Sequence, residues 1–211
     1  MVNGTIMKLH GYHKSSATLR VVIALELKKL DYEVITINLR TGEQGDMLVP
    51  ILEDKDKIIT QSLSIIEYLD EWYTHADGAQ RKCFLPVYIP NRVKVRELAQ
   101  IIACDIHPID NLRVLKYLQN NFNITEDEKI KWYHHWIHEG FRKIEEHLLR
   151  DNIFCVGDEI SIADIVLVPQ VFNAKRFKCP LSQYPKLTRV YRNCLKIQEF
   201  KKAEKIFKKG F

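Results

Sequence analysis

Two adjacent hydroxyl side chains, Ser15 and Ser16, stand just before a run with helical spacing, Thr18–Lys29. A serine in this place is usually a helix cap, because its oxygen accepts a hydrogen bond from a first-turn N–H group. The same place suits a bound thiolate. The helix dipole stabilises the negative charge, and a hydroxyl that donates to the sulfur lowers the thiol pKa. The pair therefore predicts a cap, with or without thiol activation.

A second polar helix start follows at Gln61 and Ser62, which open the run SLSIIEYLDEWY. The hydroxyl and amide of Ser62 suit a carboxylate, with Gln61 beside them. Upstream, Pro50 forces the residue before it into an extended conformation. If the Val49–Pro50 bond is cis, the Val49 backbone can pair with a bound peptide as an added strand. Alone, each feature is an ordinary cap or turn; together they favour a binding site.

Strand and helix patterns alternate around these residues. MKLHGY and the β-branched YEVITINL predict two strands on either side of the first helix. LVPILED and KIIT predict an antiparallel pair, and the Ser62 helix closes the unit. The order β-α-β followed by β-β-α is typical of a thioredoxin-like domain with a mixed sheet.

Beyond a connector at Thr74–Pro90, the sequence predicts only helices. They are expected at 92–120, 126–150, 162–172 and 187–195, with a short basic helix at the end. The predicted fold class is therefore α+β. It consists of an N-terminal thioredoxin-like domain, residues 1–84, followed by an all-helical C-terminal domain, residues 85–211.

Two polar motifs in the helical part are better explained by structure than by catalysis. Ser161 and Asp164 have the S-x-x-D spacing of a capping box before an apolar helix, which satisfies two backbone amides. His134 and His138 share one helix face, but a zinc site needs more ligands and the glutamate of HExxH is absent. We expect an exposed helix face there and no metal.

Composition excludes several classes of protein. The 211 residues carry a net charge of +5, but basic and acidic residues are interspersed, so nucleic-acid binding is not expected. No window is long and apolar enough for a membrane helix, and the N-terminus lacks the pattern of a secretion signal. Five widely spaced cysteines without a CxxC pair indicate reduced thiols and a cytoplasmic location.

Several stretches, in order, resemble the zeta class of the glutathione transferases, the maleylacetoacetate isomerases. SSATLRVVIAL is similar to the family's SSC-x-x-RVRIAL, and IHPIDNLRVLKYL to its I-x-P-x-x-N-x-x-VL segment. GDEISIADIVLVPQVFNAKRF matches its GDE-x-x-x-AD-x-x-L-x-PQ-x-x-NA-x-RF signature closely. The resemblance covers almost the whole chain.

The resemblance implies glutathione as cofactor and a cis–trans isomerisation of maleylacetoacetate to fumarylacetoacetate, in tyrosine and phenylalanine catabolism. The thiolate adds to the double bond, rotation follows, and the thiolate leaves. Ser15 would activate the thiol, Ser16 would support or cap, and Arg176 would bind a substrate carboxylate. The implied partners are glutathione and a small dicarboxylic substrate, in a homodimer. The residues expected to contact glutathione are Ser15, Ser16, Ala17, Thr18, Leu19, Arg20, Val49, Pro50, Gln61, Ser62, His107, Asn111, Leu112 and Arg113.

The chain departs from the family pattern at three places. Ala17 replaces the cysteine of SSC, and Leu19 and Val22 predict a less polar pocket rim. The segment between Leu39 and Val49 is shorter than in the family, which predicts weaker binding of glutathione. Two alternatives therefore stay open: a general glutathione transferase that conjugates small electrophiles, including α-halo acids, and a catalytically weak protein that binds a partner.

Overall fold

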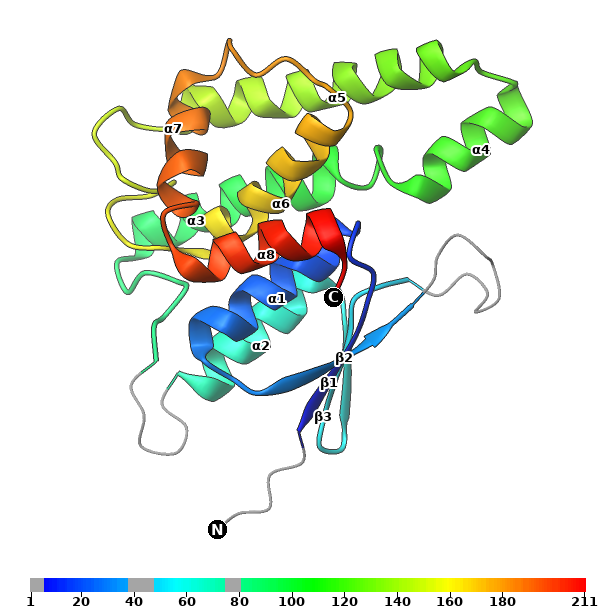
Figure 1. Cartoon of the computed structure of the whole chain (residues 1–211). Coiled ribbons are helices and arrows are strands. Elements are labelled where there is room, and N and C mark those ends of the chain that lie inside the picture. Colours follow the sequence, from blue (N-terminus) through cyan, green and yellow to red (C-terminus); the bar gives the residue numbers. More distant parts are fainter. Residues whose placement is uncertain (1–5, 38–47, 75–80) are drawn as a thin grey trace. The chain divides into compact units, whose positions relative to one another are not determined.

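The computed structural model describes residues 6–37, 48–74 and 81–211 (Figure 1). The chain divides into two compact units. The first unit comprises Met1–Phe84 and Ile197–Phe211, and the second comprises Leu85–Lys196. The sequence had placed all residues after 84 in one helical domain. The last helix instead groups with the first unit, because it packs against the first helix of the chain.

A four-stranded mixed sheet forms the base of the first unit. Its strands are β1 (Met7–Gly11), β2 (Tyr32–Thr36), β3 (Ile51–Asp54) and β4 (Lys57–Thr60), in the order β2-β1-β3-β4. The central strand β1 runs parallel to β2 and antiparallel to β3, which pairs antiparallel with β4. This topology confirms the predicted thioredoxin-like domain. The strand predicted at YEVITINL is described only to Ile37, since the residues that follow lie outside the described part.

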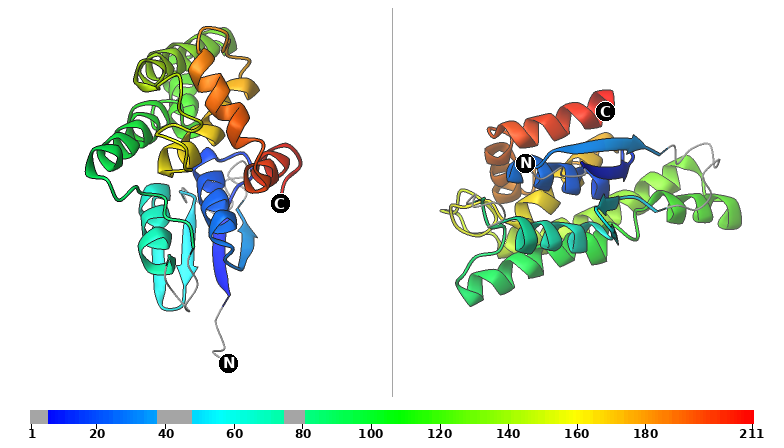
Figure 2. Two further views of the ribbon diagram at one scale, coloured as in Figure 1. Left: turned by 90° about the vertical axis from the view of Figure 1, so that its left-hand side faces the viewer. Right: turned by 90° about the horizontal axis from the view of Figure 1, so that it is seen from below.

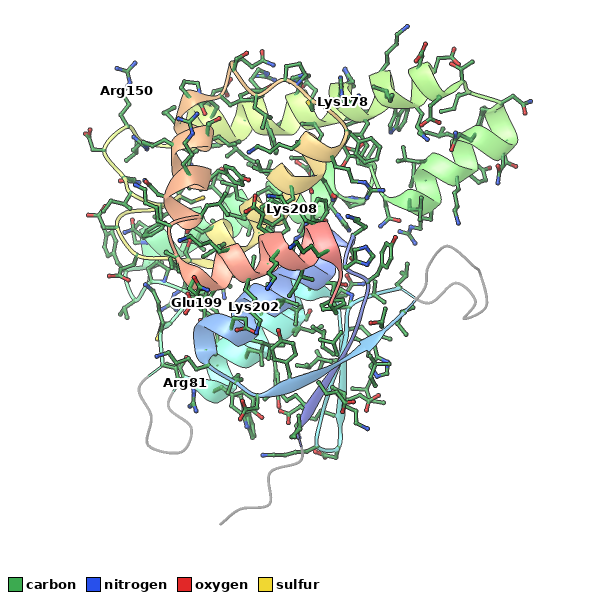
Figure 3. The ribbon with its side chains drawn as sticks, in the orientation of Figure 1. Arg81, Arg150, Lys178, Glu199, Lys202 and Lys208 are labelled. Atoms are coloured by element: carbon green, nitrogen blue, oxygen red, sulfur yellow. The ribbon has the colours of Figure 1, made fainter. Side chains whose placement is uncertain are left out.

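Three helices complete the first unit: α1 (Ser16–Lys28), α2 (Ser62–Tyr73) and α8 (Gln198–Lys209). The stretch from Val21 to Leu25 in α1 is fully buried, as expected of a helix that is apolar on all sides. It packs against both α2 and α8, and α8 runs beside α1 in both Figures 1 and 2. The labelled Lys202 of α8 pairs with Glu26 of α1 over 2.5 Å (Figure 3).

A buried lysine ties the connector to these helices. Lys28 donates from Nζ to Asp70 Oδ1 at 2.7 Å, and to Thr74 Oγ1 and the Lys82 carbonyl at 2.6 Å each. The same Asp70 oxygen accepts the Phe84 N–H group at 2.8 Å. A buried charge needs such partners. The network therefore attaches the chain at Thr74, Lys82 and Phe84 to α1 and α2.

All residues of the second unit, 85–196, are described, and they form helices and turns without a strand. The elements are α3 (Ile89–Gln100), the π-helical segment η2 (Ile101–Ile106), α4 (Leu112–Phe122), α5 (Glu126–His147), α6 (Ile162–Arg176) and α7 (Pro185–Cys194). Within residues 6–37, 48–74 and 81–211, no helix combines the length and the apolar character that crossing a membrane requires.

The single helix predicted over 92–120 was wrong, because the structure breaks it between η2 and α4. Pro108 explains the break, since proline lacks the N–H group that would continue the helix and its ring crowds the preceding turn. Asn111 then starts α4 as its cap. This break leaves a short turn, 107–111, whose residues include several site candidates.

The predicted capping box at Ser161 and Asp164 is confirmed. The Asp164 carboxylate accepts the Cys155 N–H at 2.8 Å, and the N–H and hydroxyl of Ser161 at 3.0 and 2.9 Å. Both residues are buried, so the box sets the start of α6 inside the core of the second unit.

Candidate active site

Ser15 is the N-cap of α1, at the carboxyl end of β1. Its Oγ accepts the Thr18 N–H at 3.2 Å, and its backbone is extended, with φ −83° and ψ 115°. Its own N–H donates to the Tyr12 carbonyl at 2.9 Å, which closes the turn after β1. A hydroxyl has one hydrogen and two lone pairs, so capping leaves the Ser15 hydrogen available to donate to a sulfur atom.

The capping role that we expected of Ser16 belongs to Ser15, and that expectation was wrong. Ser16 is the first helical residue, and it is buried with 1% of its surface exposed. A residue with helical backbone angles cannot direct its oxygen at the first-turn amides as an N-cap does. Ser15 is half-buried and therefore presents the more accessible hydroxyl of the pair.

Thr18 fixes the turn that carries Ser15. Its Oγ1 accepts the Tyr12 N–H at 3.3 Å, and its methyl group packs on Gly11. A Cβ atom added to Gly11 would lie 2.4 Å from Thr18 Cγ2, so only glycine permits this close approach. The end of β1 and the first turn of α1 are therefore held together from both sides of Ser15.

Arg20 joins the N-terminal part of α1 to the start of α2. Its side chain is 1% exposed, and Nη1 donates to Ser62 Oγ at 3.2 Å. The residue before Ser62, Gln61, has φ 67° and ψ 119°, a conformation that costs a non-glycine residue about 1–3 kcal/mol. Gln61 makes no side-chain cap bond, so the N-cap residue of α2 leaves its first N–H groups without the usual side-chain acceptor.

The Val49–Pro50 peptide bond is cis, as the sequence led us to expect. Pro50 is buried and Val49 half-buried, directly before β3. Pairing between β3 and β1 begins with Ile51 opposite His10, so Val49 lies just outside the sheet's paired register. The shortened segment between Leu39 and Val49 lies largely outside the described residues.

The other α1 candidates are interior residues. Ala17 is 7% exposed, whereas Thr18 and Leu19 are completely buried. The expectation that Leu19 and Val22 form a less polar pocket rim was wrong, because both side chains lie in the core at 0% exposure. Apolar side chains on all sides of α1 satisfy the packing of a central helix, which explains their type.

In the second unit, four candidates cluster at the turn between η2 and α4. His107 ends η2, with its N–H donating to the Ile102 carbonyl at 2.9 Å. Asn111 caps α4, because its side-chain oxygen accepts the Arg113 N–H at 3.1 Å. Leu112 and Arg113 are exposed at the first turn of α4. A helix start with an exposed arginine suits an anionic ligand.

Arg176 is the last residue of α6, and its side chain is exposed. Its guanidinium carbon lies 5.3 Å from the centre of the Phe177 ring. That ring stacks on Tyr133 of α5, with ring centres 3.8 Å apart. An aromatic support of this kind orients a planar guanidinium.

The two histidines of α5 are not on an exposed face, and that expectation was wrong. His134 Nε2 lies 2.8 Å from the Phe177 carbonyl, and His138 Nδ1 lies 2.7 Å from the Tyr184 hydroxyl. Both imidazoles therefore have partners in the fold. Among the described residues, no group of three or more His, Cys, Asp or Glu side chains is arranged to hold a metal ion.

One polar residue that sequence reasoning missed is Asp110, although it lies inside the quoted IHPIDNLR segment. Its carboxyl is buried, and burial raises its pKa to about 8. The available signal was an acidic residue between the apolar Ile109 and the helix cap Asn111. The stacking of Tyr133 on Phe177 was also missed, since residues 44 positions apart carry no local sequence pattern.

Comparisons with known proteins identify the family of this chain. Residues 9–76 match the model of the glutathione S-transferase N-terminal domain, and 137–193 that of its C-terminal domain. A probable maleylacetoacetate isomerase of Vibrio cholerae is 43% identical over 194 residues, 86% of this chain and 87% of that protein. A solved maleylpyruvate isomerase, described as a bacterial zeta-class glutathione S-transferase, shares 35% identity with a TM-score of 0.86, covering 93% and 95% of the two chains. The chain belongs to the zeta class of glutathione transferases.

A third similar protein was solved with ligands. It is a maleylacetoacetate isomerase of Methylobacterium extorquens with bound malonate and glutathione. It shares 29% identity and a TM-score of 0.87 with this transferase, over 95% of this chain and 97% of that one. The N-terminal domain match contains every site candidate of the first unit, and the C-terminal match contains Arg176 but not the turn at 107–111.

Proposed function

We propose that this transferase isomerises maleylacetoacetate to fumarylacetoacetate with glutathione as cofactor, in tyrosine and phenylalanine catabolism. The observation that carries the proposal is the 43% identity to the Vibrio cholerae isomerase over most of both chains. In this proposal the thioredoxin-like first unit provides most of the glutathione contacts, and the second unit, residues 85–196, binds the dicarboxylic substrate.

The start of α2 fits the γ-glutamyl carboxylate of glutathione. The helix lacks a side-chain cap from Gln61, so its first amides are available to an anion. Ser62 accepts from Arg20, and its own hydroxyl hydrogen remains to donate outward. The buried Arg20 charge lies beneath this position and favours a carboxylate further.

The Val49 backbone fits the peptide part of the cofactor. Its place before the first paired residue of β3 lets its N–H and carbonyl pair with an extended peptide. Pairing through the backbone fixes the direction of glutathione along the strand. With the γ-glutamyl group at the start of α2 and the peptide at Val49, we place the cysteinyl thiol at the first turn of α1.

Ser15 is the thiol-activating residue in this proposal. Bound glutathione supplies a thiolate, which adds to the cis double bond and leaves after rotation about the resulting single bond. The Ser15 hydroxyl donates its hydrogen to the sulfur, and the start of α1 adds the partial positive charge of its dipole. Ser16 supports this turn from inside the core.

The second unit supplies positive charge for the substrate. Arg176, supported by Phe177, binds a substrate carboxylate through its planar guanidinium. Asn111 and Arg113, at the start of α4, belong to the glutathione contacts in this proposal, because a helix start with an exposed arginine suits a carboxylate of glutathione. His107 and Leu112 border the same turn. Negative charge that develops on the substrate during thiolate addition is stabilised by these fixed donors.

Maleylpyruvate is a second candidate substrate, favoured by the 35% identity to the solved maleylpyruvate isomerase. It shares the cis double bond and both carboxylates, so the same residues would serve. Steady-state assays with maleylacetone or maleylacetoacetate, maleylpyruvate and a neutral electrophile, each with glutathione, distinguish the activities. Isomerisation should exceed conjugation of the neutral electrophile. Conjugation without isomerisation would indicate a general transferase, and no binding of millimolar glutathione would indicate a partner-binding protein.

We also propose a cytoplasmic homodimer. The five cysteines are free thiols in the structure, which supports a reducing compartment. Light scattering after size-exclusion chromatography tests the dimer, which should have about twice the mass of the 24.9 kDa chain. Fractionation of the source cells with an antibody to the protein tests the location.

A further inference from the structure

Asp110 carries a buried carboxyl group to which the proposed reaction gives no role. The residue lies in the turn between η2 and α4, with 8% of its surface exposed. Within the described part of the chain, neither carboxyl oxygen has a hydrogen-bond partner. Buried carboxylates are normally paired or hydrogen-bonded, so an isolated one requires an explanation.

The surroundings of Asp110 favour its neutral form. The groups that interact electrostatically with it are the Tyr133 hydroxyl on α5 and the Cys179 thiol after α6. Burial raises the pKa of Cys179 to about 11 and that of Tyr133 above its ordinary value, so both are uncharged at neutral pH. His107 lies on the same turn, and Arg176 on α6 acts on Tyr133. In the described residues no cation forms an ion pair with Asp110.

The backbone around Asp110 is attached to both neighbouring elements. Its N–H donates to the Ile106 carbonyl of η2 at 3.2 Å. Trp132 Nε1 of α5 donates to the carbonyl of Ile109 at 3.3 Å. The next residue, Asn111, caps α4. A shift of the Asp110 side chain therefore moves the start of α4 and changes the environment of Trp132.

We propose that the turn 107–111 stays packed against α5 only while Asp110 is protonated, and that loss of its proton releases this turn and weakens ligand binding at Asn111 and Arg113. The proton passes to solvent, and the bare carboxylate moves towards water because it has no partner where it lies. Asp110 is thus a positioning residue: its buried carboxyl oxygens do not touch a ligand, and it affects binding only by setting the position of Asn111 and Arg113. The effect on binding rests on the proposed function.

Tryptophan fluorescence between pH 6.5 and 9.5 tests the structural half without any ligand. The wild-type protein should show a transition with a midpoint near pH 8, the pKa to which burial raises Asp110. Asp110→Asn, an uncharged side chain of the same shape, should lack it, and Trp132→Phe should lose most of its amplitude. Asp110→Leu serves as a second uncharged variant if the first does not fold. An identical transition in wild type and variant, or none in either, overturns the proposal.

Calorimetry with S-methylglutathione, which has no ionisable thiol, tests the functional half. Between pH 7 and 9, the wild-type Kd should rise about tenfold relative to that of Asp110→Asn, since only the protonated protein binds well. Ionisation of the ligand itself affects both proteins alike and cancels in this ratio. An equal fall in affinity in both proteins overturns the role of Asp110 in binding. If neither protein binds at any pH, the proposed function fails, and the fluorescence result still decides on Asp110.

Discussion

The guanidinium of Arg20 donates to the hydroxyl of Ser62 over 3.2 Å, inside the first unit. This bond joins the second turn of α1 to the first residue of α2, and the two residues are 42 positions apart in sequence. Arginine keeps its charge at any working pH, so a permanent positive charge lies beneath the uncapped start of α2. One buried cation on α1 therefore contacts the start of α2.

Replacing Arg20 by Met removes this charge while keeping a side chain of similar length. We expect the Kd of glutathione to rise at least tenfold, because a hydrogen bond involving a charged group is worth about 1.5–3 kcal/mol. The kcat should change less than the Kd. Calorimetry on Arg20→Met, Ser62→Ala and the double variant measures the coupling. Strictly additive effects would contradict the bond described here.

Substitutions at Ser15 separate capping from thiol activation. Ser15→Ala should destabilise the protein by about 0.5–2 kcal/mol and lower kcat by about two orders of magnitude. Ser15→Asp keeps a good N-cap but places a negative charge beside the thiolate. Its stability in urea should stay near that of wild type while turnover is lost. Ser182→Ala, at an exposed serine in the turn before α7, is the control, and retained turnover in Ser15→Asp would refute the assigned role.

Arg176→Ala should affect acidic substrates selectively. We expect KM for maleylacetoacetate to rise ten- to a hundredfold, because a charged hydrogen bond to a carboxylate is lost. KM for a neutral electrophile should stay within about twofold of the wild-type value, because this substrate has no carboxylate for Arg176 to bind. Arg150→Ala removes an arginine that points away from the helices of the second unit and serves as control (Figure 3). Equal effects on both substrates would argue against carboxylate binding by Arg176.

Two capping boxes in the second unit offer a comparison between a buried and an exposed case. Asp164→Ala leaves the buried amides of Cys155 and Ser161 without their acceptor. We therefore expect the free energy of unfolding to fall by about 3–5 kcal/mol. Glu128→Ala, in the exposed box of Thr125 and Glu128 at the start of α5, should lower the free energy of unfolding far less, since water replaces the carboxylate. Urea unfolding of both variants measures the difference. Similar losses would show that burial does not decide the cost.

Local patterns in the sequence predicted much of the fold. The β-α-β and β-β-α order and the Ser161–Asp164 box could be found because each depends on residues close in sequence. The break at Pro108 was missed, since the apolar spacing on either side continues across it. The placement of α8 with the first unit depends on long-range pairs such as Lys202 with Glu26, which local patterns do not reveal.

The sequence shows the residue types of the candidate site but not their surroundings in the fold. Ser15, Ser62 and Pro50 stand out by residue type at helix starts and before a strand. Which serine caps α1 depends on backbone angles, and the burial of Leu19 depends on what packs around α1. The Arg20–Ser62 bond joins helices distant in sequence, so only a folded chain reveals it.

The assignment of α8 to the first unit has a consequence for synthesis on the ribosome. The second unit is inserted between two segments of the first, so its residues emerge in one continuous stretch. The first unit lacks the helix that covers α1 until α8 has left the exit tunnel. A nascent chain halted after α7 should therefore expose the apolar side of α1 to chaperones while the second unit is already protected from protease.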